Sequence, residues 1–327
     1  MKSKIGQYTF ILIALILAGL FIYLTLQQTD FQILKAAAQR ANYFWFFVSM
    51  ALSILSYWLR AARWKYLLSP MGYEVPTRSG FWAISLAYFA NLTIPRSGEV
   101  ARATSLYKME KVPVDKSLGT IVLERVIDVL FLGLFFGLTL VFNFQALQSF
   151  LDFAENPSWG KYGMGVGVLV LVGITIYAFR NFLRRFPLFK RIELFLTGIW
   201  TGFKSILLLK ERTKFILYSF AIWICYFLMT YLVLFAFPET SHFGLGEGFF
   251  LIIAGALGMI LPVVGGLGYP YVMSMAFAAV YLSHGQTAEE GKIIGNYFGL
   301  MLYFAQIISI IIFGILSFYF IPKISRN

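Results

Sequence analysis

The sequence has few charged residues and almost none of the side chains that build metal or disulfide sites. Only 13% of its 327 residues are charged, whereas about 25% is usual in soluble chains. A single cysteine, Cys225, excludes a disulfide within the chain. With only two histidines, His242 and His284, we expect neither a Cys/His metal site nor a histidine-based catalytic arrangement. The sequence therefore predicts a protein that is not an enzyme and holds no cofactor.

Long apolar runs are abundant, and 59% of the residues are hydrophobic. Several runs exceed the roughly 20 residues that cross a bilayer, and they are continuous rather than alternating, which favours helices over barrel strands. We expect an all-α integral membrane protein whose residues 1–327 form a single polytopic membrane domain. Six runs are predicted to be transmembrane helices: Tyr8–Leu26, Tyr43–Leu59, Leu118–Phe142, Tyr162–Phe179, Phe215–Phe237 and Ile293–Phe320.

Two further apolar regions, residues 80–110 and 248–282, are interrupted by proline and glycine. Such interruptions break helices, and broken backbone at membrane depth must be buried in protein or line a wet cavity. We interpret both regions as re-entrant helical hairpins, the first from the cytoplasm and the second from outside.

The two hairpins share a weak sequence similarity, since Leu92–Gly98 can be aligned with Met259–Gly265 through Pro-x-x-Gly. Inverted repeats with discontinuous helices are a recurrent plan in transporters. We interpret the two halves, 1–160 and 161–327, as inverted repeats of this kind.

Lysine and arginine are unevenly distributed between the two sides that this topology defines. The side with both termini collects most of them, which the positive-inside rule assigns to the cytoplasm. The net charge of +12 is therefore attributed to anchoring on anionic lipids of a bacterial inner membrane rather than to nucleic acid. Residues 187–209 alternate apolar and polar faces at helical spacing, which predicts an amphipathic interfacial helix. That helix is either a surface elbow or a regulatory partner site.

Charged residues gather in and after the first hairpin. Glu99 and Arg102 are three residues apart and share a helix face, as do Glu124 and Asp128, four apart. Because charges inside a bilayer are costly, the carboxylates of the third span are expected to pair with arginines of the hairpin. A structural ion-pair network and a polar cavity for a charged headgroup both remain open. Arg96, beside the break at Pro95, is the preferred phosphate ligand because guanidinium groups bind phosphate in a bidentate manner.

The second hairpin contains Gly265-Gly266-Leu267-Gly268-Tyr269. No strand precedes these glycines, so they do not form a nucleotide-binding fingerprint. They either allow close helix packing or form a flexible gate or a backbone-lined lipid site.

Asn91–Arg102 followed by Val122–Asp128 resembles the signature of the flippase-like membrane domain of lysylphosphatidylglycerol synthases, and Leu261–Gly268 resembles its second motif. The resemblance covers essentially the whole chain and implies movement of lipids between leaflets. Some members carry a cytoplasmic aminoacyl-transferase domain, and we expect a stand-alone member without it.

The resemblance and the residues together predict a transporter of a phospholipid or another phosphate-bearing lipid. The alternative is a non-transporting membrane subunit that presents lipid to a separate lipid-synthesising or lipid-modifying enzyme. The expected substrate-binding residues are Asn91, Arg96, Gly98, Glu99, Arg102, Glu124, Arg125, Asp128, Gly265, Gly266, Gly268 and Tyr269.

The topology can be tested by cysteine labelling from each side of the membrane in a Cys225→Ala background. Cysteines placed in the loop Lys108–Lys116 are expected to react only with reagents on the cytoplasmic side, because this loop carries several lysines. Labelling of this loop from the periplasm would contradict the topology.

Overall fold

The structure is a computed structural model that describes residues 31–94, 97–155, 209–260 and 268–325. Within these residues all regular secondary structure is helical, which confirms the expected all-α membrane protein. The elements are α2 (Phe31–Arg40), α3 (Tyr43–Leu68), η1 (Ser69–Met71), α4 (Thr77–Thr93), α5 (Gly98–Glu110), α6 (Val114–Phe142), α7 (Phe144–Glu155), α11 (Arg212–Tyr231), η2 (Leu232–Ala236), α12 (Leu245–Ile260), α13 (Gly268–Ser283) and α14 (Ala288–Ile324).

Helices α3, α6, α11 and α14 are long and apolar enough to cross a bilayer. They match four of the predicted spans. At 1.5 Å per residue, the 37 residues of α14 extend for about 55 Å. The other two predicted spans, Tyr8–Leu26 and Tyr162–Phe179, and almost all of the predicted interfacial helix 187–209 lie outside the described residues.

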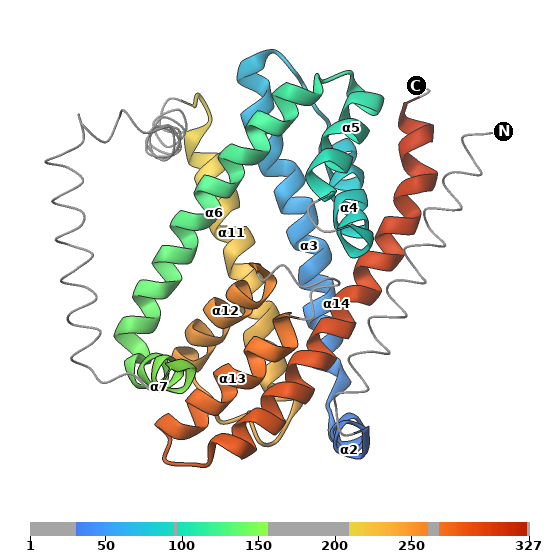
Figure 1. Cartoon of the computed structure of the whole chain (residues 1–327). Coiled ribbons are helices and arrows are strands. Elements are labelled where there is room, and N and C mark those ends of the chain that lie inside the picture. Colours follow the sequence, from blue (N-terminus) through green and yellow to red (C-terminus); the bar gives the residue numbers. More distant parts are fainter. Residues whose placement is uncertain (1–30, 95–96, 156–208, 261–267, 326–327) are drawn as a thin grey trace, which may run out of the picture.

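The two interrupted regions form helical hairpins. In Figure 1, α4 and α5 descend from and return to one end of the molecule, while α12 and α13 do the same from the opposite end. Their legs have 13 to 17 residues, which is at or below the shortest length that crosses a bilayer. The hairpins begin slightly before the predicted bounds, at Thr77 and Leu245.

The order and direction of the helices show an inverted repeat. The series α3, α4, α5, α6 corresponds to α11, α12, α13, α14, and each helix runs opposite to its counterpart (Figure 1). Each hairpin also packs against the long helix of the other half, α4 against α14 and α12 against α6, while α3 and α11 pack together. The two halves are therefore intertwined, so neither presents a separate core.

Short polar signals set the helix starts. The Asn42 side chain accepts a hydrogen bond from the Phe44 N–H at the start of α3, and Thr287 does the same for Glu290 at the start of α14. Such caps satisfy N–H groups that have no partner within the helix. Pro76 and Pro113 immediately precede α4 and α6.

Glycines on one face of α14 let α13 approach closely. A Cβ atom added to Gly291 or Gly295 would lie 2.6 Å from a backbone carbonyl oxygen of α13, and one added to Gly299 would lie 3.0 Å from Pro270. These glycines recur every four residues, the small-residue spacing that lets membrane helices pack closely. The packing of the second hairpin on α14 therefore depends on glycine at these positions, where any larger residue would collide with α13.

The two ends of the molecule differ in charge. We call the end where α3, α5 and α14 finish and α4, α6 and α11 start the basic end (upper end in Figure 1). Its described cations are Lys65, Arg78, Lys108, Lys111, Lys116, Lys210, Arg212, Lys214 and Lys323. Acids at the opposite end include Asp152, Glu239, Glu247, Glu289 and Glu290. This distribution favours a basic end that faces the cytoplasm. The orientation stays a prediction, which the labelling experiment tests.

We expect Gly295→Ala to lower the apparent melting temperature in detergent, because the added methyl group forces α13 away from α14 at a cost of roughly 1–3 kcal/mol. Gly133→Ala is the control, since a Cβ atom there contacts nothing within 4 Å among the described residues. Gly133→Ala is expected to be neutral or slightly stabilising, because alanine favours a helix more than glycine does. Equal melting temperatures for the two variants would contradict the close-packing interpretation.

Candidate functional site

The centre of the charged constellation is a buried ion pair between the first hairpin and α6. Arg102 of α5 donates two hydrogen bonds to Glu124 of α6, from Nη1 to Oε2 at 2.7 Å and from Nη2 to Oε1 at 3.0 Å. Glu124 is completely buried, and the Arg102 guanidinium lies 3.7 Å from the centroid of the Trp64 ring. This confirms the expected pairing of α6 with an arginine of the hairpin, and parallel bonds of this kind fix the orientation of both groups.

Two arginines of α3 complete the cluster. Arg60 and Arg63 are buried, and their Nη2 atoms lie 3.7 Å and 3.9 Å from Oε2 of Glu124. Both also approach Asp128 of α6, at 3.6 Å and 3.5 Å. The predicted span ends at Leu59, but α3 continues as one helix to Leu68. This boundary was wrong because Arg60 and Arg63 find carboxylates inside the protein.

The burial of Arg60 and Arg63 is indicated in the sequence by a stripe of polar residues along one face of α3. The buried polar residues of α3 follow one another at intervals of four and three, which places them on one helix face. They are Ser49, Ser53, Ser56, Arg60 and Arg63. Three serines within an apolar run mark this face as turned towards protein rather than lipid, so the arginines that continue the stripe share its direction.

Hydroxyl groups from further helices hold the arginines of α3. The Arg60 Nη1 atom donates to the hydroxyl groups of Tyr88 on α4, at 3.1 Å, and Tyr226 on α11, at 2.9 Å. Arg63 donates to Ser219 of α11 at 3.2 Å. The cluster thereby joins α3, α4, α5, α6 and α11, which are otherwise connected mainly by apolar packing.

The cluster carries more positive than negative charge. Arg60, Arg63 and Arg102 face the carboxylates of Glu124 and Asp128, and the buried Nε atoms of all three arginines find no hydrogen-bond acceptor within the described part of the chain. Charges taken out of water are stable only when their partners are present and well placed. Removing one carboxylate would therefore leave cations uncompensated in a low dielectric.

A second charged pair lies beside this cluster but is much more exposed. The Nε atom of Arg125 lies 3.4 Å from Oε1 of Glu99, and the two side chains are 55% and 45% exposed. Arg125 also approaches Asp128 at 3.7 Å. Glu99 and Arg125 thus connect the start of α5 to α6 on the surface that the described residues leave open, whereas Arg102 and Glu124 connect them in the interior.

Asn91 and Gly98 close the first hairpin. The Asn91 side-chain oxygen accepts a hydrogen bond from the Gly98 N–H at 2.7 Å, so the end of α4 caps the start of α5. Gly98 packs against the carbonyl oxygen of Ala87, which leaves no space for a side chain. Both residues, predicted as headgroup ligands, therefore have a structural role in holding the two legs together.

Of the predicted residues of the second hairpin, Gly268 and Tyr269 lie at the start of α13 and take part in none of the ion pairs of the charged cluster. Tyr269 stacks on Tyr303 with ring centroids 6.5 Å apart, and it packs against an apolar group that includes Phe89 and Leu92 of the first hairpin. Gly268 is buried at the start of α13. In the described part of the chain Tyr269 therefore joins an apolar group to which α4 and α14 both contribute. Arg96, Gly265 and Gly266 lie outside the described residues.

Comparison with known families agrees with these observations. A family model described as the lysylphosphatidylglycerol synthase TM region matches residues 11–321. The chain belongs to this family. The match covers both hairpins and the charged cluster, and it confirms the expected family. Family membership identifies a membrane protein linked to lipid handling.

One curated relative is a UPF0104 membrane protein, MJ1595, of Methanocaldococcus jannaschii. It is 30% identical over 188 residues, which are 55% of this chain and 52% of the relative. The matched part thus spans about half the length of that relative. No solved structure matches the chain.

The two charged pairs predict different responses to mutation. Glu124→Gln is expected to lower the free energy of unfolding by about 3–5 kcal/mol, because it strands buried arginines. Glu99→Gln removes an exposed carboxylate and should change it by about 1 kcal/mol or less. Unfolding in mixed detergent micelles measures both.

Neutralising Arg102 as well, in a Glu124→Gln/Arg102→Gln variant, should recover part of the stability that Glu124→Gln loses. Equal losses for Glu124→Gln and Glu99→Gln would contradict the distinction between a buried pair and an exposed pair.

Proposed function

We propose that this protein moves a phospholipid or another phosphate-bearing lipid between the two leaflets of the membrane. Family membership supports a role in lipid handling, and the inverted repeat with two discontinuous helical hairpins is a plan used by transporters. The headgroup would pass along the protein while the acyl chains stay in the bilayer. The basic end is proposed to face the cytoplasm of a bacterial inner membrane, with both termini on that side.

The observation that carries the proposal is the half-exposed pair of Glu99 and Arg125. Arg125 lies well inside α6, a helix that starts at Val114 and ends at Phe142, so its guanidinium lies at membrane depth. Ionisable groups at this depth normally face a polar pathway. The Arg125 guanidinium lies 3.4 Å from Glu99 and 3.7 Å from Asp128. It has five N–H donors, so it retains donors for a phosphate group.

The buried cluster supplies the rigid support for such a site. Arg102, about one turn after Glu99, and Glu124, the residue before Arg125, fix α5 to α6 beside the exposed pair. The apolar group formed by Phe89 of α4, Tyr303 of α14 and Tyr269 of α13 would close the pathway at this level. Transport therefore requires one half to move against the other, as in other inverted-repeat transporters.

A non-transporting subunit that presents lipid to an enzyme is the second candidate. The matching family is described as the membrane region of a synthase, which favours a partnership with a lipid-synthesising enzyme. The two candidates differ in one measurement, because only the transporter moves lipid when reconstituted alone.

The transport proposal predicts loss of activity without loss of stability when the exposed pair is changed. Arg125→Gln and, at the hairpin break, Arg96→Ala should each lower the rate at which a fluorescent phospholipid crosses vesicles containing the purified protein by about tenfold, because about 1.4 kcal/mol of phosphate binding is lost. Their melting temperatures should stay within a few degrees of the parent protein.

Lys116→Gln is the matched control, since it removes a cation that is exposed at the basic end and away from the pair. Unchanged transport by Arg125→Gln would refute the role of the exposed pair. Absence of lipid movement by the parent protein, together with co-purification of an enzyme, would favour the lipid-presenting subunit.

A further inference from the structure

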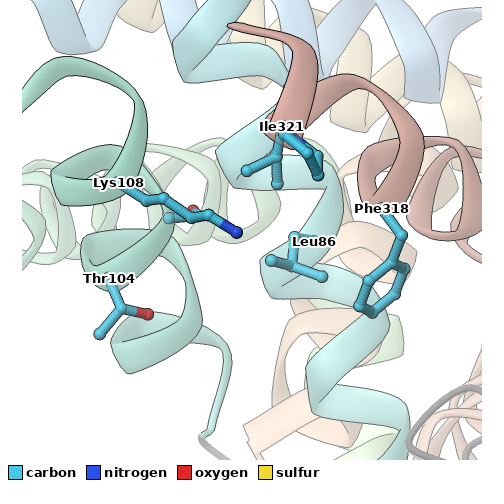
Figure 2. A pocket seen from close by; sticks show the side chains of 7 residues that line it. Leu86, Thr104, Lys108, Phe318 and Ile321 are labelled. Carbon is cyan, nitrogen blue, oxygen red and sulfur yellow. The ribbon is translucent and has the colours of Figure 1, made fainter. Parts of the chain in front are cut away.

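A pocket lies between the first hairpin and α14 at the basic end, away from the charged cluster. Its cavity volume is about 230 Å³, which accommodates a headgroup or part of an acyl chain but not a whole lipid. Figure 2 shows Lys108 reaching from α5 into this pocket, with Leu86 of α4 and Phe318 and Ile321 of α14 on the other side. The walls of the pocket are therefore formed by three helices: α4 and α5 of the hairpin, and α14.

The walls divide into an apolar part and a polar part. Leu86, Phe318 and Ile321 make α4 and α14 apolar there, whereas α5 contributes Thr104 and Lys108. The Thr104 hydroxyl donates to the Val100 carbonyl at 2.8 Å, a local bond from which it can rotate towards a ligand. An amphipathic ligand fits such a pocket better than a purely polar or purely apolar one.

Lys108 is an exposed cation that no acid neutralises within the described parts of the chain. Two other lysines at the same end have partners: Lys214 pairs with Glu211 at 2.8 Å, and Lys323 hydrogen-bonds the Tyr319 hydroxyl. Lys108 lies two residues before the end of α5, near the level where the chain leaves the membrane. An ammonium group at this level meets the phosphates of the adjacent leaflet, which is the anionic one if the basic end is cytoplasmic.

We propose that this pocket binds one anionic phospholipid. Its phosphate lies at the Lys108 ammonium and the Thr104 hydroxyl, and the beginning of one acyl chain packs against Leu86, Phe318 and Ile321. Nine residues of α5 separate Lys108 from Glu99, a distance of about 14 Å along the helix, so this site is separate from the exposed pair. The inference does not depend on transport, because a lipid bound here would brace α4 and α5 against α14 in either proposed function.

Native mass spectrometry of the purified full chain in detergent tests the proposal, with phosphatidylglycerol and phosphatidylethanolamine as probes. Lys108→Gln should weaken phosphatidylglycerol binding about tenfold, because a charge-assisted hydrogen bond to the phosphate is lost. It should weaken phosphatidylethanolamine binding less, because the ammonium group of that lipid already offsets the phosphate charge. Lys111→Gln is the matched control, because it removes a cation three residues away that does not line the pocket. Thr104→Trp should block the pocket and weaken binding of both lipids.

The outcomes separate this site from its alternatives. Parent-like phosphatidylglycerol binding by Lys108→Gln, or an equal loss in Lys111→Gln, would overturn the proposal. Competition by glycerol phosphate as effective as that by the lipid would also overturn it, because the apolar walls would then contribute nothing. Crosslinking of a photoreactive group at Lys108 to residues 1–30 instead of to lipid would show that the chain itself fills the pocket. A Lys108→Gln protein that binds normally refutes this site whether or not the parent transports lipid.

Discussion

The bidentate ion pair between Arg102 and Glu124 is the constraint on which the first half of the molecule depends. Both groups are buried, so each is stable only while the other is in place. Arg60 and Arg63 surround the same carboxylate, which extends the constraint to α3. A hairpin too short to span the membrane is thereby attached to two full spans at a fixed depth.

The second half has the same architecture but a different chemistry. Its hairpin is held by close backbone contact, because glycines at 291, 295 and 299 let α13 pack directly on α14. Ion pairs in the first half and close packing at glycines in the second half have the same effect: each holds a broken helix inside an apolar environment. Among the described residues, charge near the centre of the molecule comes from the first half, and it is there that the exposed Glu99–Arg125 pair and the proposed headgroup site occur.

The outcome at particular residues explains how far the sequence could lead. The hairpins were predictable because proline and glycine interrupt runs that are otherwise continuous, and the Arg102–Glu124 pairing was predictable because buried charges need partners. The positions of Arg60 and Arg63 were not, because an arginine at the end of an apolar run is as consistent with the membrane surface as with a buried pair. Asn91 and Gly98 were assigned to a ligand although they close the hairpin, since a polar residue at a break fits both roles.

The sequence by itself determined the class of the protein, its helical spans, the two hairpins and the charge difference between its ends. These follow from local composition, because lipid admits few kinds of backbone and few charged side chains. Only the tertiary structure decided which charges are buried together and which stay exposed, and that Tyr269 joins an apolar group shared by α4 and α14. Those choices depend on contacts between helices far apart in the chain, and neither helical periodicity nor hydropathy specifies which faces of distant helices meet.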